Sequence, residues 1–266
     1  LASSDVASAT SRGVRRAKEI AGRGPVRWGG AMTTHVLALG GGGFSMSDGY
    51  AATALDRYAL GLAGVDRPTV CFAPTASGDA TLYIERFEAA YAPLDCETRV
   101  LRLVADGAQS VARTLDGVDV LMVGGGSTVN LVALWDIHGV TRELRRLAAG
   151  RDLVLAGLSA GANCWFEGCT TDSFGPEVVP WRGGTGFVAG SFCPHADGED
   201  RVDDYAAAVA SGVLPAGWAA DDGAAVHVVD GVVRAHLAER PGARTYRVEA
   251  DGTGGASVVA QDMTLF

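Results

Sequence analysis

The segment Gly157-Leu-Ser159-Ala-Gly161 places a serine between small residues. The apolar run at 153–156 is typical of a buried strand, and residues 160–167 can begin a helix. In a strand–turn–helix setting, small neighbours allow a sharp turn that exposes the serine hydroxyl beside free backbone N–H groups. The pattern therefore predicts that Ser159 is a nucleophile and that N–H groups at the helix start stabilise an oxyanion.

Such a serine needs a base, because a free hydroxyl is a weak nucleophile, and the chain offers five histidines. His195 is favoured, since it follows a strand-like run and begins a polar loop, which supplies both rigid support and access to a cleft. His227 and His236 alternate with apolar residues in later strand-like runs, as core residues do. His35 begins the first strand-like run, and His138 precedes a glycine at a helix end, where histidine often only caps.

An acid should fix the tautomer of the base. Asp172 follows an apolar helical segment and lies between the serine and the histidine in the chain, so we select it as the third member. Three other acids stay as alternatives: Asp197, Glu199 and Glu167.

The elements that must position these residues follow a repeating pattern. Short apolar runs bounded by Gly or Pro occur at 35–39, 69–73, 98–103, 118–123 and 153–157. Amphipathic stretches lie between them, near 48–63, 80–92, 107–115 and 127–149. Alternation of strand and helix predicts an α/β three-layer sandwich with a mostly parallel central sheet, whose strands are buried on both faces.

The two ends of the chain differ from this pattern. Strand-like runs near 187–193, 225–229 and 232–237, separated by Gly-rich turns, predict antiparallel edge strands within one domain spanning 32–266. Residues 1–31 are rich in Ser, Ala, Arg and Gly, which suggests an N-terminal extension that is flexible or of cloning origin, with a short helix at 12–21. A chain starting at Met32 should therefore keep its melting temperature and activity.

Composition excludes several functions. The 266 residues suffice for one large α/β domain, and 48% hydrophobic with 20% charged residues is ordinary for a globular protein. A net charge of −9 without a basic stripe argues against nucleic acid as a partner. No apolar run approaches the roughly 20 residues of a membrane helix, so we expect no membrane partner and a cytoplasmic location.

Two features that suggest other chemistry have simpler interpretations. The five cysteines form no C-x-x-C pair, which favours reduced, buried thiols over disulfides or a zinc site. The loop Gly40-Gly-Gly-Gly43 follows a strand but lacks the third glycine of a dinucleotide loop and the Gly-Lys of a P-loop. Tight backbone packing beside a strand end explains the glycines better than nucleotide binding.

Several motifs in the same order make the region from 35 to about 229 resemble the peptidase E (aspartyl dipeptidase) family, relatives of cyanophycinases. The motifs are Gly-Gly-Gly-Gly-Phe-Ser at 40–45, Phe-Ala-Pro-Thr-Ala-Ser-Gly-Asp at 72–79, Gly-Gly-Gly-Ser-Thr at 124–128, Gly-Leu-Ser-Ala-Gly-Ala-Asn-Cys-Trp-Phe at 157–166, Ser-Phe-Cys-Pro-His at 191–195 and Asp-Asp-Gly-Ala-Ala at 221–225. The family is similar in fold to class I glutamine amidotransferase domains (flavodoxin-like), with serine in place of cysteine.

The resemblance implies a hydrolase that removes N-terminal aspartate from dipeptides through a serine triad, without metal or cofactor. It implies Ser159 as nucleophile, His195 as base and Asp172 as acid, although members differ in whether Asp or Glu fills that position. It also implies an oxyanion site formed by the N–H of Ala160 with that of Gly125 or Gly126.

Arg201 lies six residues after the predicted base, in Gly198-Glu-Asp-Arg201, which resembles a Gly-Glu-Thr-Arg segment of the family. A guanidinium can bind a carboxylate through two parallel N–H bonds, so we expect Arg201 to bind the acidic side chain of the substrate. The alternative is a surface ion pair with Asp203, Asp204 or Glu199. The loop before Arg201 is shorter than in family members with tested aspartyl dipeptidase activity.

Two other functions remain open at the level of sequence. An α/β-hydrolase esterase shares the G-x-S-x-G pattern but places its histidine far from the serine, which would favour His227 or His236. A non-catalytic ligand-binding protein on an amidotransferase-like scaffold would have no activated hydroxyl at Ser159. The oligomeric state is also open, with a homodimer among the possible forms.

Overall fold

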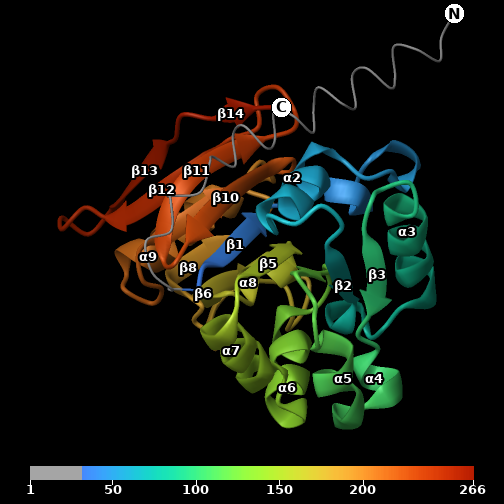
Figure 1. The fold of residues 1–266 in the computed structure, drawn as a ribbon. Helices are drawn as coiled ribbons and strands as arrows, with labels where there is room; N and C mark the ends of the chain where they lie inside the picture. The colour runs from blue at the N-terminus through green and yellow to red at the C-terminus, as the bar shows by residue number, and fades with distance from the viewer. Residues whose placement is uncertain (1–31) are drawn as a thin grey trace, which may run out of the picture.

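The computed structural model describes residues 32–266, so the predicted extension and its helix at 12–21 lie outside the described residues. The larger of two β-sheets has the strand order β14-β11-β10-β1-β5-β4-β2-β3 (Figure 1). Its strands are β1 (Thr34–Leu39), β2 (Thr69–Ala73), β3 (Glu97–Val100), β4 (Val120–Val123), β5 (Leu153–Leu158), β10 (Ala224–Val229), β11 (Val232–Ala238) and β14 (Thr264–Leu265).

Five neighbouring strands run parallel, in the order β1, β5, β4, β2 and β3. On the other side of β1, β10 pairs antiparallel with β1, and β11 pairs antiparallel with β10. Parallel pairing aligns the end of β1 with the end of β5, where Leu39 lies opposite Leu158. Antiparallel pairing brings the start of β10 to the same point, where Leu39 lies opposite Ala225. The predicted mostly parallel sheet is therefore confirmed, and the runs at 225–229 and 232–237 are antiparallel as predicted. They are not edge strands, because β10 lies between β1 and β11, and β14 pairs with the outer side of β11.

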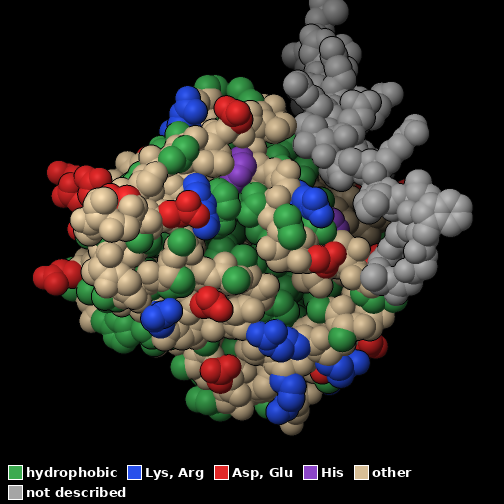
Figure 2. Space-filling model, turned by 90° about the vertical axis from the view of Figure 1, so that its left-hand side faces the viewer, with side chains coloured by type: hydrophobic (Ala, Val, Ile, Leu, Met, Phe, Trp, Pro, Cys, Tyr) green, Lys and Arg blue, Asp and Glu red, His purple; other side chains and the backbone are tan. Residues whose placement is uncertain are grey.

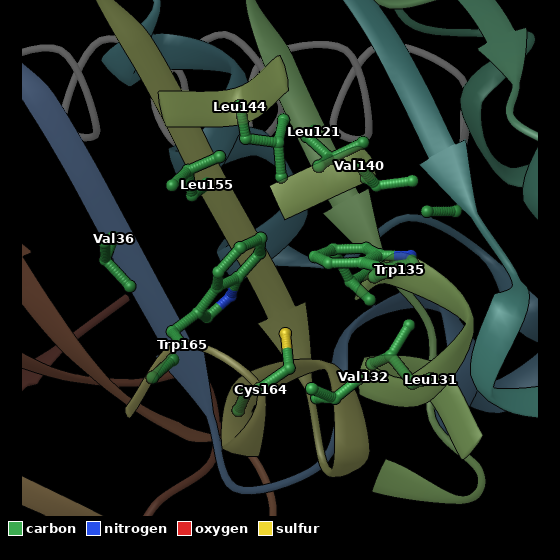
Figure 3. Packing of buried hydrophobic residues seen from close by; sticks show 14 of the residues in the cluster. Val36, Leu121, Leu131, Val132, Trp135, Val140, Leu144, Leu155, Cys164 and Trp165 are labelled. Atoms are coloured by element: carbon green, nitrogen blue, oxygen red, sulfur yellow. The ribbon is translucent and has the colours of Figure 1, made fainter. Parts of the chain in front are cut away.

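Alternate residues of the parallel strands enter two different apolar clusters, because strands covered on both faces bury every side chain. Leu37 and Val154 pack with α2 and α3 on one face, and Val36 and Leu155 pack with α5, α6 and α7 on the other. Figure 3 shows Trp135 and Trp165 within the second cluster. The helices are α2 (Ala54–Leu62), α3 (Thr81–Tyr91), α4 (Leu103–Asp106), α5 (Val111–Leu115), α6 (Thr128–His138), α7 (Val140–Gly150), α8 (Ala160–Asn163) and α9 (Arg201–Ala210).

A second sheet, in the order β13-β12-β9-β8-β6-β7, lies beside the first (Figure 1). The run at 187–193, expected as an antiparallel edge strand, is instead β8, an inner strand parallel to both β6 and β9. It takes this place because Phe166 and Phe192 stack and join the core on one face of the first sheet. The strands are β6 (Phe166–Thr171), β7 (Val179–Arg182), β8 (Val188–Cys193), β9 (Gly217–Ala220), β12 (Thr245–Ala250) and β13 (Ala256–Ala260).

Surface charge, helix length and the state of the cysteines can be compared with the predictions made from composition. Figure 2 shows acidic and basic side chains interspersed on the side of β12 and β13, without a basic stripe on that face. Within residues 32–266, no helix combines the length and apolar character needed to cross a membrane. All five cysteines are free thiols; four of them are buried, and Cys96 is half-buried.

Candidate active site

Ser159 lies in a strained turn between β5 and α8, with φ 53° and ψ −116°. A side chain at Gly157 would come within 2.2 Å of the Gly161 carbonyl oxygen, and one at Gly161 within 2.2 Å of the Val123 carbonyl oxygen. The backbones approach so closely that only glycine fits on either side of the serine. The predicted strand–turn–helix setting is therefore present, and it holds the hydroxyl at the end of the parallel strands.

His195 follows β8 by two residues and also has a positive φ, of 53°. Its backbone N–H donates to the Gly40 carbonyl oxygen at 3.3 Å. A side chain at Gly41 would approach the imidazole Cε1 and Nδ1 of His195 within 2.9 Å. The glycine loop after β1 therefore lets the backbone pack against the histidine ring, as expected from its poor match to nucleotide-binding loops.

Three side chains form a hydrogen-bonded chain. His195 Nε2 lies 2.9 Å from Ser159 Oγ, and His195 Nδ1 lies 2.6 Å from Asp222 Oδ1. With the Nδ1–H donated to the carboxylate, Nε2 is left to accept the serine proton. The side chains of His195 and Asp222 are 29% and 30% exposed, so the base remains accessible from a cleft.

The residue beside the histidine is Asp222, not the selected Asp172. Asp222 lies in the turn before β10, and because β10 pairs with β1, this turn is next to Gly41 at the end of β1. Asp172 lies in the loop after β6, is exposed, and makes no side-chain hydrogen bond or ion pair with the residues that the structure describes. Its position in the chain between serine and histidine does not bring it to the imidazole. The signal that sequence reasoning passed over was the Asp221-Asp222-Gly223 motif.

A small network supports Asp222. Its backbone N–H donates to Asp197 Oδ1 at 2.9 Å, and the Arg240 guanidinium donates to its carbonyl oxygen at 2.8 Å while pairing with Asp197. Burial alone would raise the pKa of Asp197, but the hydrogen bonds from the Asp222 N–H and Arg240 outweigh it, so that pKa lies below its usual value. Asp197, one of the alternative acids, thus contacts the backbone of Asp222 rather than the imidazole.

Among residues 32–266, the remaining alternatives make no hydrogen bond or ion pair with Ser159 or His195. Glu167 accepts from the backbone N–H of Gly190 at 3.1 Å. Glu199 is exposed in the loop before α9. His138 ends α6, as a capping residue would.

His227 and His236, the histidines favoured by the esterase alternative, are hydrogen-bonded to other residues. His227 is 4% exposed and lies 3.0 Å from His35 Nδ1 and 2.9 Å from the Tyr58 hydroxyl. Burial lowers the pKa of His227 to about 3. His236 Nδ1 lies 2.8 Å from the Thr245 hydroxyl. Neither ring is hydrogen-bonded to Ser159, whose imidazole partner is His195, so neither His227 nor His236 acts as the base of this serine.

The predicted oxyanion residues surround the serine. A side chain at Gly125 would lie 3.6 Å from the Ser159 Cβ, and its N–H donates to the Tyr83 hydroxyl at 3.2 Å. Gly126 has φ +137°, and a side chain there would come within 2.3 Å of the Ala76 carbonyl oxygen, so only glycine fits. Ala160 is the first residue of α8, and its N–H therefore has no acceptor within the helix.

Two hollows meet at Ser159 and His195. The first hollow, of about 210 Å³, is lined by polar groups that include Arg201, Asp172 and Asn163, and by Gly126 and Ala160. Among residues 32–266, no side chain forms an ion pair or hydrogen bond with the Arg201 guanidinium, so the surface pair with Asp203, Asp204 or Glu199 is not formed in this structure. The second hollow, of about 400 Å³, is more open and more apolar, and it extends along α3.

Similar proteins are known from sequence and structure. Residues 36–236 match the family described as peptidase family S51. A Bacillus subtilis (strain 168) protein described as the uncharacterized peptidase YgaJ is 43% identical over 214 residues, covering 80% of this chain and 91% of that protein.

Two solved structures share the fold. A peptidase from an acI-B1 Actinobacterium has a TM-score of 0.56 at 13% identity, covering 87% of this chain and 97% of the other. A putative peptidase E protein from Listeria monocytogenes EGD-e has a TM-score of 0.52 at 17% identity, covering 77% and 98%. The predicted fold class is therefore confirmed.

Proposed function

Since this chain belongs to peptidase family S51, we propose that it is a serine-type dipeptidase that removes N-terminal aspartate through the triad Ser159, His195 and Asp222. The observation that carries the proposal is the continuous hydrogen-bonded chain from the Asp222 carboxylate through His195 to the Ser159 hydroxyl. Its order and geometry are those by which a serine becomes a nucleophile at neutral pH.

In the proposed reaction, Ser159 Oγ attacks the carbonyl carbon of the peptide bond while His195 Nε2 takes the hydroxyl proton. Asp222 stabilises the resulting imidazolium, and the N–H groups of Ala160 and Gly126 donate to the oxyanion, because the Gly125 N–H already donates to the Tyr83 hydroxyl. The peptide C–N bond then breaks, and the departing amine takes the proton from His195. Water, deprotonated by the same imidazole, hydrolyses the acyl-enzyme and restores the free serine.

The first hollow suits an N-terminal aspartate because its lining includes Arg201 and Asp172, neither of which forms an ion pair with another residue of 32–266. We assign Arg201 to the β-carboxylate of the substrate, where a guanidinium can donate two parallel hydrogen bonds. Asp172, which does not contact the imidazole, faces the same hollow and can accept from the α-ammonium group. This arrangement requires a free N-terminus and an acidic first residue.

The test is hydrolysis of dipeptides with a common second residue and Asp, Asn or Ala first, by the parent and by Arg201→Ala. The parent should prefer Asp, and Arg201→Ala should lower kcat/KM for the Asp substrate by about ten-fold to a thousand-fold, since charge-assisted hydrogen bonds are lost. Labelling of Ser159 by a small uncharged serine reagent should stay nearly unchanged. A parent that prefers uncharged first residues, or fails to react at Ser159, would contradict the proposal.

A further inference from the structure

The second hollow combines exposed apolar side chains with a single cation. Met46, after η1 (Gly43–Ser45), is 52% exposed, and Leu82 of α3 is 57% exposed, although both are large and apolar. Tyr83, Leu158 and Ser159 line the same hollow. An apolar surface that leads to a nucleophile is suited to an apolar group of the substrate.

Arg86 lies on the same hollow and has no carboxylate partner. Among residues 32–266, no side chain pairs with its guanidinium, which instead lies 3.7 Å above the centre of the Tyr50 ring. Tyr50 is held in the left-handed region, at φ 57°, in η2 (Asp48–Tyr50), which packs against α3. A positive φ is costly for a tyrosine, and here it places the ring under the guanidinium. The arginine is therefore held in place while its hydrogen-bonding edge stays available to an anion.

We infer that the second hollow binds the leaving residue of a dipeptide, with its apolar side chain against Met46 and Leu82 and its free α-carboxylate at Arg86. This assignment rests on the proposed dipeptidase function. Ser159 and His195 line both hollows, so a peptide bond held at the serine has one residue in each. The first hollow offers charges of both signs, as an N-terminal aspartate requires, whereas the second offers one cation and apolar surface.

The assignment also explains selection for dipeptides. The residue after the cleaved bond carries a free carboxylate only when the substrate ends there, and in a longer peptide that carboxylate is replaced by an uncharged amide. Arg86 would then lose its partner. A preference for the free acid is therefore expected to depend on Arg86 and to be independent of Arg201.

The experiment compares kcat/KM for Asp-Leu and Asp-Leu-amide in the parent, Arg86→Gln, Arg86→Lys and Arg113→Gln. The last is a matched control, an exposed arginine on α5 that lines neither hollow. The parent should prefer the free acid by about ten-fold to a hundred-fold, the contribution of a hydrogen-bonded charge. Arg86→Gln should reduce this ratio to about one, Arg86→Lys should retain part of it, and Arg113→Gln should leave it unchanged.

The outcomes separate this inference from the proposed function. Equal parent activity on Asp-Leu and Asp-Leu-amide, or equal losses on both in Arg86→Gln, would overturn the inference and leave the dipeptidase proposal intact. A parent that cleaves neither substrate would overturn the proposed function and this inference with it. Circular dichroism and Ser159 labelling of Arg86→Gln distinguish a misfolded variant from a loss of substrate contact.

Discussion

His195 and His227 differ in their surroundings, although each ring is hydrogen-bonded through both nitrogens. His195 contacts a carboxylate and a serine hydroxyl at the meeting point of two hollows. His227 on β10 contacts His35 on the neighbouring strand and Tyr58 on α2, which packs on the first sheet, and burial there lowers the pKa of His227 to about 3. A carboxylate partner stabilises an imidazolium during turnover, whereas a buried site without an acid keeps the imidazole neutral.

The backbone conformations of His195 and His227 also differ. His227 lies within the regular strand β10, but His195 and Ser159 both have φ 53°. Left-handed backbone is uncommon in residues other than glycine and persists only where packing determines it. Here the glycine loop after β1 and the close approach at Gly157 and Gly161 enforce it. The comparison indicates that partner and backbone, rather than residue type, distinguish the proposed base from a core histidine.

The largest expected effect tests which histidine is the base. Ser159→Ala and His195→Ala should each lower kcat by about 10³-fold to 10⁶-fold, with little further loss in the double variant, because the two act as one unit. His227→Gln should retain kcat but unfold more easily, by about 1–3 kcal/mol, since the buried partners His35 and Tyr58 lose hydrogen bonds. Steady-state kinetics and denaturant titration measure the two effects. A normal kcat in His195→Ala together with a loss of kcat in His227→Gln would show that His227, and not His195, is the base.

The next effect separates Asp222 from Asp172. Asp222→Asn should lower kcat by about 10²-fold to 10⁴-fold, because an amide no longer favours the productive tautomer of His195. Asp172→Asn should instead raise KM for Asp-X substrates by about ten-fold with a small change in kcat, if it binds the α-ammonium group. The opposite split, a loss of kcat confined to Asp172→Asn, would restore Asp172 as the acid of the triad.

The smallest effect concerns pH and stability. An unfolded histidine titrates near pH 6.5, but His227 in the folded chain titrates at about 3, so protons bind the unfolded state preferentially between these values. The free energy of unfolding should therefore fall with decreasing pH in this window, by up to about 1.4 kcal/mol per pH unit from His227.

Asp56 changes the free energy of unfolding with pH in the opposite direction to His227. The variant His227→Gln separates the contribution of the histidine from that of Asp56. Burial raises the pKa of Asp56 to about 6, so the folded chain gains a proton there, and stability, as the pH falls from about 6 toward 4. Asp56 is present in both the parent and His227→Gln, so its contribution cancels in the difference between their free energies of unfolding. That difference should narrow from pH 7 to pH 4.5 in urea titrations, and a constant difference would show that His227 does not titrate as its burial implies.

Local sequence patterns were sufficient for much of the fold. Near-continuous apolar runs separated by amphipathic stretches identify β1, β2, β4 and β5 as parallel strands, because a strand buried on both faces cannot alternate. The second sheet did not follow from the pattern. Its strands β6, β8 and β9 are short and pair across intervening segments, so their partners depend on which apolar faces meet in three dimensions.

The candidate site also combines residues predicted from the sequence with one found only in the structure. The sequence by itself predicted Ser159 and His195, which lie 2.9 Å apart in the structure, because a sharp strand–helix turn and a polar loop after a strand are encoded by neighbouring residues. Only the tertiary structure shows that Asp222, and not Asp172, is hydrogen-bonded to the imidazole. Its place depends on β10 pairing with β1, and on β8 pairing with β9, which together bring the turn before β10 against the imidazole. These contacts join segments distant in the chain, and no local spacing of residues specifies them.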